Sequence, residues 1–171
     1  VGDFYQGGVV FYIFQSGDTG YIAGETHGLI AAVADQSSGI RWSSGSYVFI
    51  GAIETAIGTG IANTTAIISV HSAQGQTETS YAAGLTKAYN GGGYTDWFLP
   101  SKDELNQMRI NRGTINTTAA ANGGSDFSSD YYWSSSETGT TGAWIQGFGN
   151  GQQVSTNKYY DNIRVRAVRA F

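Results

Sequence analysis

The chain has 171 residues, a net charge of −4 and no cysteine. This length predicts a single domain, residues 1–171, that can bury a hydrophobic core without the help of disulfide bonds. The missing cysteine excludes disulfides and thiolate chemistry, the acidic charge argues against a nucleic-acid partner, and no apolar run is long enough for membrane insertion.

The composition favours a protein of the cell exterior. Charged residues make up 13% of the chain, and it contains 25 glycines and 11 tyrosines. Few charges with much Gly, Ser, Asn and Tyr are typical of extracellular β-rich binding proteins, in which Tyr supplies contact area at low entropic cost. A merely glycine-rich loop protein would show the same composition. The chain begins at Val1, which favours a processed start or a segment of a longer protein.

The N-terminal part predicts short, buried strands. Residues 7–14 (GGVVFYIF) place apolar side chains on both faces, which is typical of a central strand. Residues 29–34 (LIAAVA) predict a second buried strand, and residues 40–42 (IRW) a third.

Helical patterns occupy the middle of the chain. Ile53, Ala56 and Ile57 have helical spacing and stop at Gly58, and Asn63 predicts the N-cap of a further helix. An amphipathic stripe then predicts a helix over residues 81–89. Its apolar positions are Tyr81, Ala82, Leu85, Ala88 and Tyr89.

The clearest helix start follows residues 97–99 (WFL). Pro100 biases the residue before it toward an extended conformation. Ser101 and Glu104 have the spacing of a capping box. We therefore predict an extended segment that ends at a helix running from Lys102 to about Arg112, with Gly113 as its stop.

Beyond Gly113 the pattern turns to β. Residues 115–129 predict a polar loop, and residues 131–134, 143–148 and 152–154 predict strands. Asn150-Gly151 predicts a type I′ hairpin turn between the last two strands. A polar, aromatic loop follows over residues 155–162.

The last nine residues alternate until Val168 breaks the pattern. Either a bulge lies near Ala167, or Arg169 points inward and needs a carboxylate partner. The candidate partners are Asp96, Asp103 and Glu137. Because strands, then helices, then strands follow one another without βαβ alternation, the fold class is α+β.

Three motifs carry a family resemblance. They are GGYTDWFLPSKDEL at residues 92–105, YYWSSSE at 131–137, and AWIQGFGNGQ…RVRAVRAF between 143 and 171. With the N-terminal GGVVFYIF…GETHGLIAA, the likeness covers nearly the whole chain. The chain resembles a bacterial family of C-type-lectin-like domains that includes the C-terminal domain of collagen-like adhesins.

The resemblance implies a C-type-lectin-like fold. In it the N- and C-terminal strands pair, helices pack on a small mixed or antiparallel sheet, and a loop-rich face binds ligand. Similar domains act as adhesins or as receptor-binding tips of fibres, including phage tail fibres, and are often homotrimers. Related folds carry hypervariable loops, which residues 155–162 would suit. Enzymes of the superfamily that make formylglycine need a cysteine pair that is absent here, so we expect no enzyme.

The candidate ligand surface combines the predicted hairpin turn and the polar loop. Tyrosine rings would supply contact area and the polar groups hydrogen bonds. The predicted ligand-binding residues are Asn150, Gln152, Asn157, Lys158, Tyr159, Tyr160 and Asp161.

No cofactor is expected, with calcium as the open alternative. The proline-containing calcium motif of classical C-type lectins is absent, because the only proline stands in Leu99-Pro100-Ser101. Asp126, Asp130 and Glu137 could still supply the oxygen ligands that calcium prefers, or they could be solvated acids.

Three functions follow from these observations. The first is an extracellular or cell-surface recognition domain whose partner is a glycan or a surface receptor. The second is a structural trimerisation or capping module of a fibre without a ligand of its own. For either function the alternative location is a virion or its tail fibre. The third, a glycosidase-like enzyme, would need two carboxylates facing one cleft at roughly 5 to 10 Å.

Overall fold

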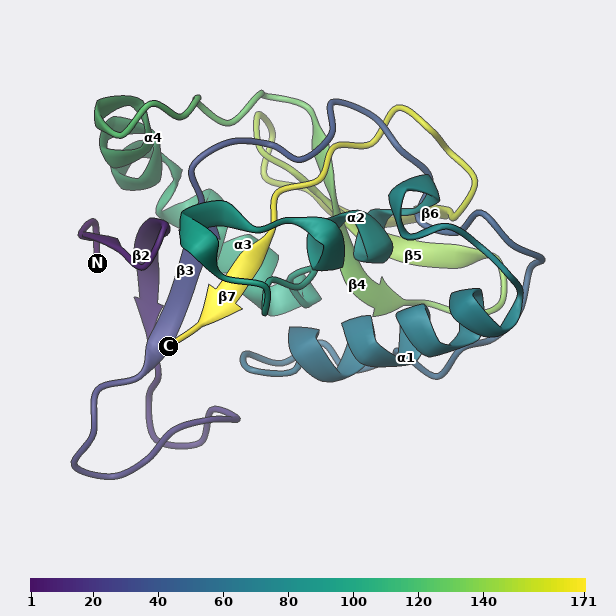
Figure 1. Ribbon diagram of the computed structural model, residues 1–171, viewed down its shortest axis with the longest axis horizontal. Coiled ribbons are helices and arrows are strands. Elements are labelled where there is room, and N and C mark those ends of the chain that lie inside the picture. Colours follow the sequence, from purple (N-terminus) through teal and green to yellow (C-terminus); the bar gives the residue numbers. More distant parts are fainter.

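The protein folds into two small antiparallel sheets with helices packed around them. The computed structural model describes all residues, 1–171. Figure 1 shows the sheets as two separate units, with the N-terminal and C-terminal strands together in one of them. No helix has both the length and the apolar character needed to cross a membrane.

The first sheet has the strand order β1-β2-β3-β7. Its strands are β1 (Phe4–Tyr5), β2 (Gly8–Ile13), β3 (Gly28–Ala32) and β7 (Val168–Ala170). As predicted, β2 is central and apolar on both faces. The C-terminal strand does join the N-terminal sheet, and its direct neighbour is β3, where Leu29 lies opposite Ala170.

The second sheet has the order β4-β5-β6. These strands are β4 (Tyr131–Glu137), β5 (Gly142–Gly147) and β6 (Gln153–Asn157). The segment before β7 connects the two sheets. It forms a parallel bridge from Arg164 to Tyr132 of β4, and an antiparallel bridge joins Val168 to Phe98.

Four α-helices complete the fold. They are α1 (Gly60–Ala73), α2 (Ala82–Ala88), α3 (Lys102–Ile110) and α4 (Arg112–Ala121), with short 3-10 turns at Glu78–Ser80 and Gly91–Gly93. The predicted capping box at the start of α3 is present, because the Ser101 hydroxyl accepts from the Glu104 amide and the Glu104 carboxylate accepts from the Ser101 amide. The extended segment before it ends at this cap, as expected.

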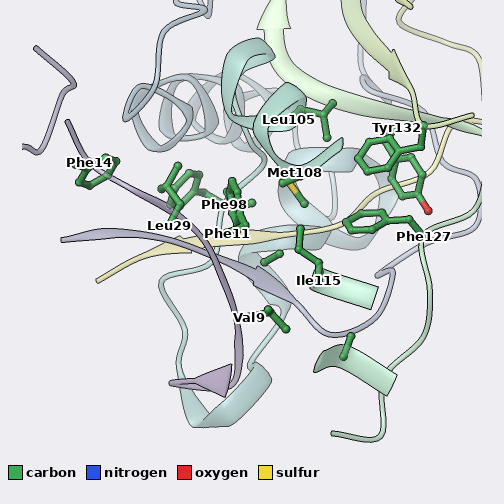
Figure 2. Packing of buried hydrophobic residues seen from close by; sticks show 14 residues of the cluster. Val9, Phe11, Phe14, Leu29, Phe98, Leu105, Met108, Ile115, Phe127 and Tyr132 are labelled. Atoms are coloured by element: carbon green, nitrogen blue, oxygen red, sulfur yellow. The ribbon is translucent and has the colours of Figure 1, made fainter. Parts of the chain in front are cut away.

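The largest apolar cluster lies between the first sheet, α3 and α4 (Figure 2). The cluster contains Phe11 of β2, Leu29 of β3, Met108 of α3 and Ile115 of α4. A second cluster, which contains Trp42, Trp133 and Leu99, fills the space between α1, α2 and the second sheet.

Helix α4 corrects the prediction of a polar loop after Gly113. Ile115 and Ala119 are both fully buried, one helical turn apart. Their burial stabilises a helix whose remaining Ala, Thr and Asn residues give a weak apolar pattern. Gly113 therefore lies inside a helix rather than at its stop.

The expected helix at residues 53–57 and strand at 40–42 are also absent. Within residues 53–57, the Glu54 carbonyl accepts from the Asn63 side chain and the Thr55 carbonyl accepts from the Asp103 amide instead of from helical amides. The Trp42 amide bonds to the Lys158 carbonyl, in a segment that is itself not a strand. Asn63 lies inside α1 rather than at its N-cap, and its side-chain amide donates to the Glu54 carbonyl at 2.6 Å.

The hairpin between β5 and β6 exists, but its turn is not type I′. Gly151 has a positive φ of 77°, whereas Asn150 does not, and a type I′ turn needs positive φ at both central residues. The loop is longer than two residues, because the first cross-strand pair is Gln146 with Gln153.

Candidate recognition surface

The predicted ligand-binding residues fall at the two ends of β6. Asn150 and Gln152 precede the strand, whereas Asn157 is its last residue and Lys158 to Asp161 follow it. A strand of this length separates its ends by roughly 15 Å, at ~3.3 Å per residue. The structure therefore presents two patches, a hairpin tip and a loop, rather than one continuous site.

At the hairpin tip the polar side chains bond to one another. The Asn150 side-chain amide donates to the Tyr131 hydroxyl at 3.0 Å and to Gln152 Oε1 at 3.2 Å. The Gln152 backbone amide donates to Asn150 Oδ1 at 3.1 Å. These bonds hold the tip in a defined shape while Asn150 and Gln152 remain exposed.

At the other end of β6 an aromatic pair forms. The rings of Tyr47 and Tyr159 stack with centroids 3.9 Å apart and planes inclined by 16°. The Tyr47 hydroxyl donates to Asn157 Oδ1 at 2.6 Å, and the Tyr159 hydroxyl donates to the Gly45 carbonyl. The Arg41 guanidinium lies 5.8 Å from the Tyr159 ring centroid.

We call Arg41, Tyr47, Asn157, Tyr159 and Tyr160 the aromatic platform. Tyr160 is 56% exposed, as expected, and Tyr159 is partly buried by its stacking. The sequence prediction missed Arg41 and Tyr47. The available signal was the position of Tyr47 directly after the Ser/Gly-rich segment 43–46, which indicates a loop.

Lys158 requires a correction, because it does not point to the surface. Its side chain is 1% exposed, and its Nζ lies 2.6 Å from Glu137 Oε2 and 4.6 Å from the Trp42 ring centroid. Burial lowers the pKa of the Lys158 ammonium, and the bond to Glu137 opposes that change. The side chain therefore holds the platform from beneath and cannot contact a ligand.

Glu137 anchors the loop on the other side of the platform. Its Oε1 accepts the backbone amides of Ile50 at 2.9 Å and Ala52 at 3.1 Å, together with that of Gly51. The Lys158 ammonium also donates to the Val48 carbonyl at 3.3 Å. One buried ion pair thus connects β4 to both loops that carry the platform.

His71 supports the same loop from α1. Its Nδ1 donates to the Ile67 carbonyl at 2.8 Å, which leaves Nε2 to accept from the Ser43 hydroxyl at 2.9 Å. Burial lowers the pKa of His71, with the nearby Lys158 charge acting in the same direction. The neutral ring, stacked on Tyr81, has a structural role.

The three candidate calcium ligands do not come together. Asp126 is exposed, Asp130 pairs with Arg164 at 2.9 Å, and Glu137 is paired in the interior. Bonds from the Ser128 hydroxyl and Arg164 lower the pKa of Asp130. The protein contains no group of three or more His, Asp or Glu side chains placed to hold a metal ion.

A pair of catalytic carboxylates is not found in a shared pocket. The protein has three pockets, and each is lined by a single carboxylate. These are Asp96 in the first, Asp35 in the second and Asp3 in the third. Glu104 is fully buried, and burial raises its pKa to about 7. The backbone amides that donate to the carboxylate act in the opposite direction and lower the pKa by less. Its carboxylate joins the starts of α1 and α3 rather than facing a cleft.

The α+β fold with two small antiparallel sheets is consistent with a C-type-lectin-like domain. Residues 31–169 match the family model described as the Lcl C-terminal domain, and the chain belongs to this family. The family is adhesin-associated, so the protein is an adhesin-like or lectin-like C-terminal domain. No curated protein matches the chain.

Proposed function

We propose that this domain is a non-catalytic recognition module of the cell exterior that binds a glycan or a surface receptor through the aromatic platform. The stacked pair of Tyr47 and Tyr159 carries the proposal. Both hydroxyls are bonded within the protein, so the rings are fixed before a ligand arrives. Rigid aromatic side chains supply contact area at low entropic cost.

Neighbouring groups supply polar contacts around these rings. Asp161 is exposed, and the Arg41 guanidinium is exposed next to the Tyr159 ring. Tyr160 offers a further ring that is 56% exposed. A platform of rings edged by charged groups matches the usual composition of binding sites, in which few polar groups fix the orientation of the ligand.

A glycan array and a cell-binding assay test this proposal with three matched tyrosine variants. Tyr47→Ala and Tyr160→Ala should each weaken binding about tenfold or more, as truncation of a central contact does. Tyr21→Ala is the control, because Tyr21 is 40% exposed in a different loop. Full binding by the double variant Tyr47→Ala/Tyr160→Ala would refute the placement of the site.

A second candidate function, a trimerisation or capping module of a fibre, is favoured by a separate apolar patch. Val1, Phe4 and Tyr5 are 58%, 48% and 46% exposed, and Tyr5 packs edge-on against Phe171 at 5.3 Å. Exposed apolar side chains gathered in one place are typical of interaction surfaces. Light scattering decides the matter: a trimer that Phe4→Ser dissociates supports this function, and a monomer opposes it.

A further inference from the structure

Helix α1 is apolar on more than the face that packs on the core. It has no Asp, Glu, Lys or Arg between Gly60 and Ala73. Ile67 is fully buried on the inner face, whereas Ile61 is 50% exposed. The exposed side of α1 also carries Thr65, Ser69 and Ser72. Its apolar part is therefore the strip at Ile61 and Ile68, which is suited to contact another apolar group.

This strip forms one wall of a pocket. The pocket has a volume of about 250 Å³, and Ile61 and Ile68 of α1 line it together with Trp97 and Phe98. The two aromatic residues are 1% and 3% exposed. Pockets for drug-sized ligands measure roughly 300–1,000 Å³, so this one suits a smaller molecule with about one ring.

The pocket offers one charge without a partner of opposite sign. Lys87 lines it, and its Nζ donates to the Thr95 carbonyl at 3.1 Å. No Asp or Glu lies within salt-bridge distance of Lys87. Asp96, the other charged lining residue, pairs with the Arg169 guanidinium. The lysine ammonium therefore has donors left for an anion.

The remaining polar groups of the lining are already bonded inside the protein. The Thr64 hydroxyl bonds to both backbone groups of Leu99, and the Thr65 hydroxyl donates to the Ile61 carbonyl. The Trp97 indole N–H donates to a backbone carbonyl at 3.1 Å. An uncharged polar ligand would thus find few partners.

We propose that this pocket binds a small amphipathic carboxylate. The apolar part of the ligand, one aromatic ring or a short alkyl chain, lies against Trp97 and Phe98 beside Ile61. Its carboxylate accepts from the Lys87 ammonium. The pocket is lined by none of the residues of the aromatic platform, so the proposal stands independently of the recognition function.

Three probes with the same ring and chain test the chemistry: phenylacetate, 2-phenylethanol and phenethylamine. The indole N–H signal of Trp97 in ¹H–¹⁵N spectra reports occupancy of the pocket. We expect phenylacetate to bind about tenfold more tightly than the alcohol, because a hydrogen bond to a charged group strengthens binding by that order. We expect phenethylamine to bind more weakly than either. No shift with phenylacetate, or equal binding of the amine, would overturn the proposal.

Two variants test the residues. Lys87→Met should lower the affinity for phenylacetate to that of 2-phenylethanol, while Lys102→Met, the matched variant at the other surface lysine, should leave it unchanged. Ile61→Glu should abolish phenylacetate binding without unfolding the protein. Ile61 is half exposed in the first turn of α1, where a negative charge is favourable. Wild-type binding by Lys87→Met or Ile61→Glu would contradict the proposed site.

Discussion

Lys158 Nζ lies 2.6 Å from Glu137 Oε2, and the two side chains are 1% and 0% exposed. A pair this deeply buried is costly to desolvate, so its value depends on the further bonds that each partner makes. Glu137 accepts three backbone amides from residues 50–52. The pair therefore fixes the loops of the aromatic platform to β4.

Replacing Lys158 alone should be strongly destabilising. Lys158→Met leaves the Glu137 carboxylate buried without its cation, and breaking such a pair costs about 3–5 kcal/mol. Urea unfolding measures the loss in free energy of unfolding. Lys102→Met is the matched control, because Lys102 lies on the surface against the Trp144 ring, and it should cost less than ~1 kcal/mol.

The double variant Glu137→Gln/Lys158→Met separates the pair from its surroundings. With no unpaired charge left inside, it should cost less than the sum of the two single variants. Additive costs would show that the two groups do not stabilise the fold through each other.

A second ion pair allows a comparison between a buried and an exposed carboxylate. Asp35 Oδ1 lies 2.7 Å from Arg166 Nε, and the two side chains are 14% and 0% exposed. Asp96, the partner of Arg169, is 55% exposed. We expect Asp35→Asn to lower the free energy of unfolding by about 3 kcal/mol or more, and Asp96→Asn to lower it by a smaller amount, because the Asp96 carboxylate is exposed and solvent screens the pair. Equal costs in urea unfolding would contradict this ranking.

The sequence predicted features that depend on neighbouring residues. The capping box at Ser101 and Glu104 lies within four residues, and the apolar run of β2 can be recognised without knowledge of its partners; both predictions were confirmed. Asp96 was one of three candidate partners for Arg169, and the structure selects it. The slip in alternation at Val168 left a bulge or an inward Arg169 open, and the burial of Arg169 shows that it points inward, where it needs a carboxylate.

Features that depend on distant contacts were missed. Lys158 stands in a polar segment, and only its contacts with Glu137 and Trp42 bury it. Helix α4 depends on the packing of Ile115 into the core rather than on its composition. The stacking of Tyr47 on Tyr159 joins two loops far apart in the chain, which a single sequence does not reveal.

Two adjacent glycines should respond differently to the same substitution. Gly92 and Gly93 have positive φ values of 66° and 81°, so alanine strains the backbone at both by about 1 kcal/mol. A Cβ at Gly92 would overlap the Gly7 Cα, whereas one at Gly93 meets nothing within 4 Å. Gly92→Ala should therefore cost about 3 kcal/mol in total. Thermal unfolding measures both, and equal melting temperatures would show that the contact with Gly7 is unimportant.

Glu104 makes stability depend on pH in a direction opposite to that of a typical surface acid. Its Oε1 accepts from the Gly58 amide at 2.8 Å, and its Oε2 accepts from the Ser101 amide at 2.7 Å. Burial is the larger effect and raises the pKa from 4.5 to about 7. Between these two pH values the folded protein holds the Glu104 proton more tightly than the unfolded chain does.

The contribution of Glu104 to the free energy of unfolding should therefore fall as the pH rises from 4.5 to about 7, and level off above that. A shift of this size corresponds to about 3 kcal/mol. Urea unfolding across this range, for the wild type and Glu104→Gln, measures the effect as the difference between the two curves. That difference removes every group that titrates alike in both proteins. Asp103→Asn, which leaves Glu104 in place, should keep the wild-type slope. A difference that does not vary with pH would mean that the amides of Gly58 and Ser101 outweigh burial and keep the carboxylate charged.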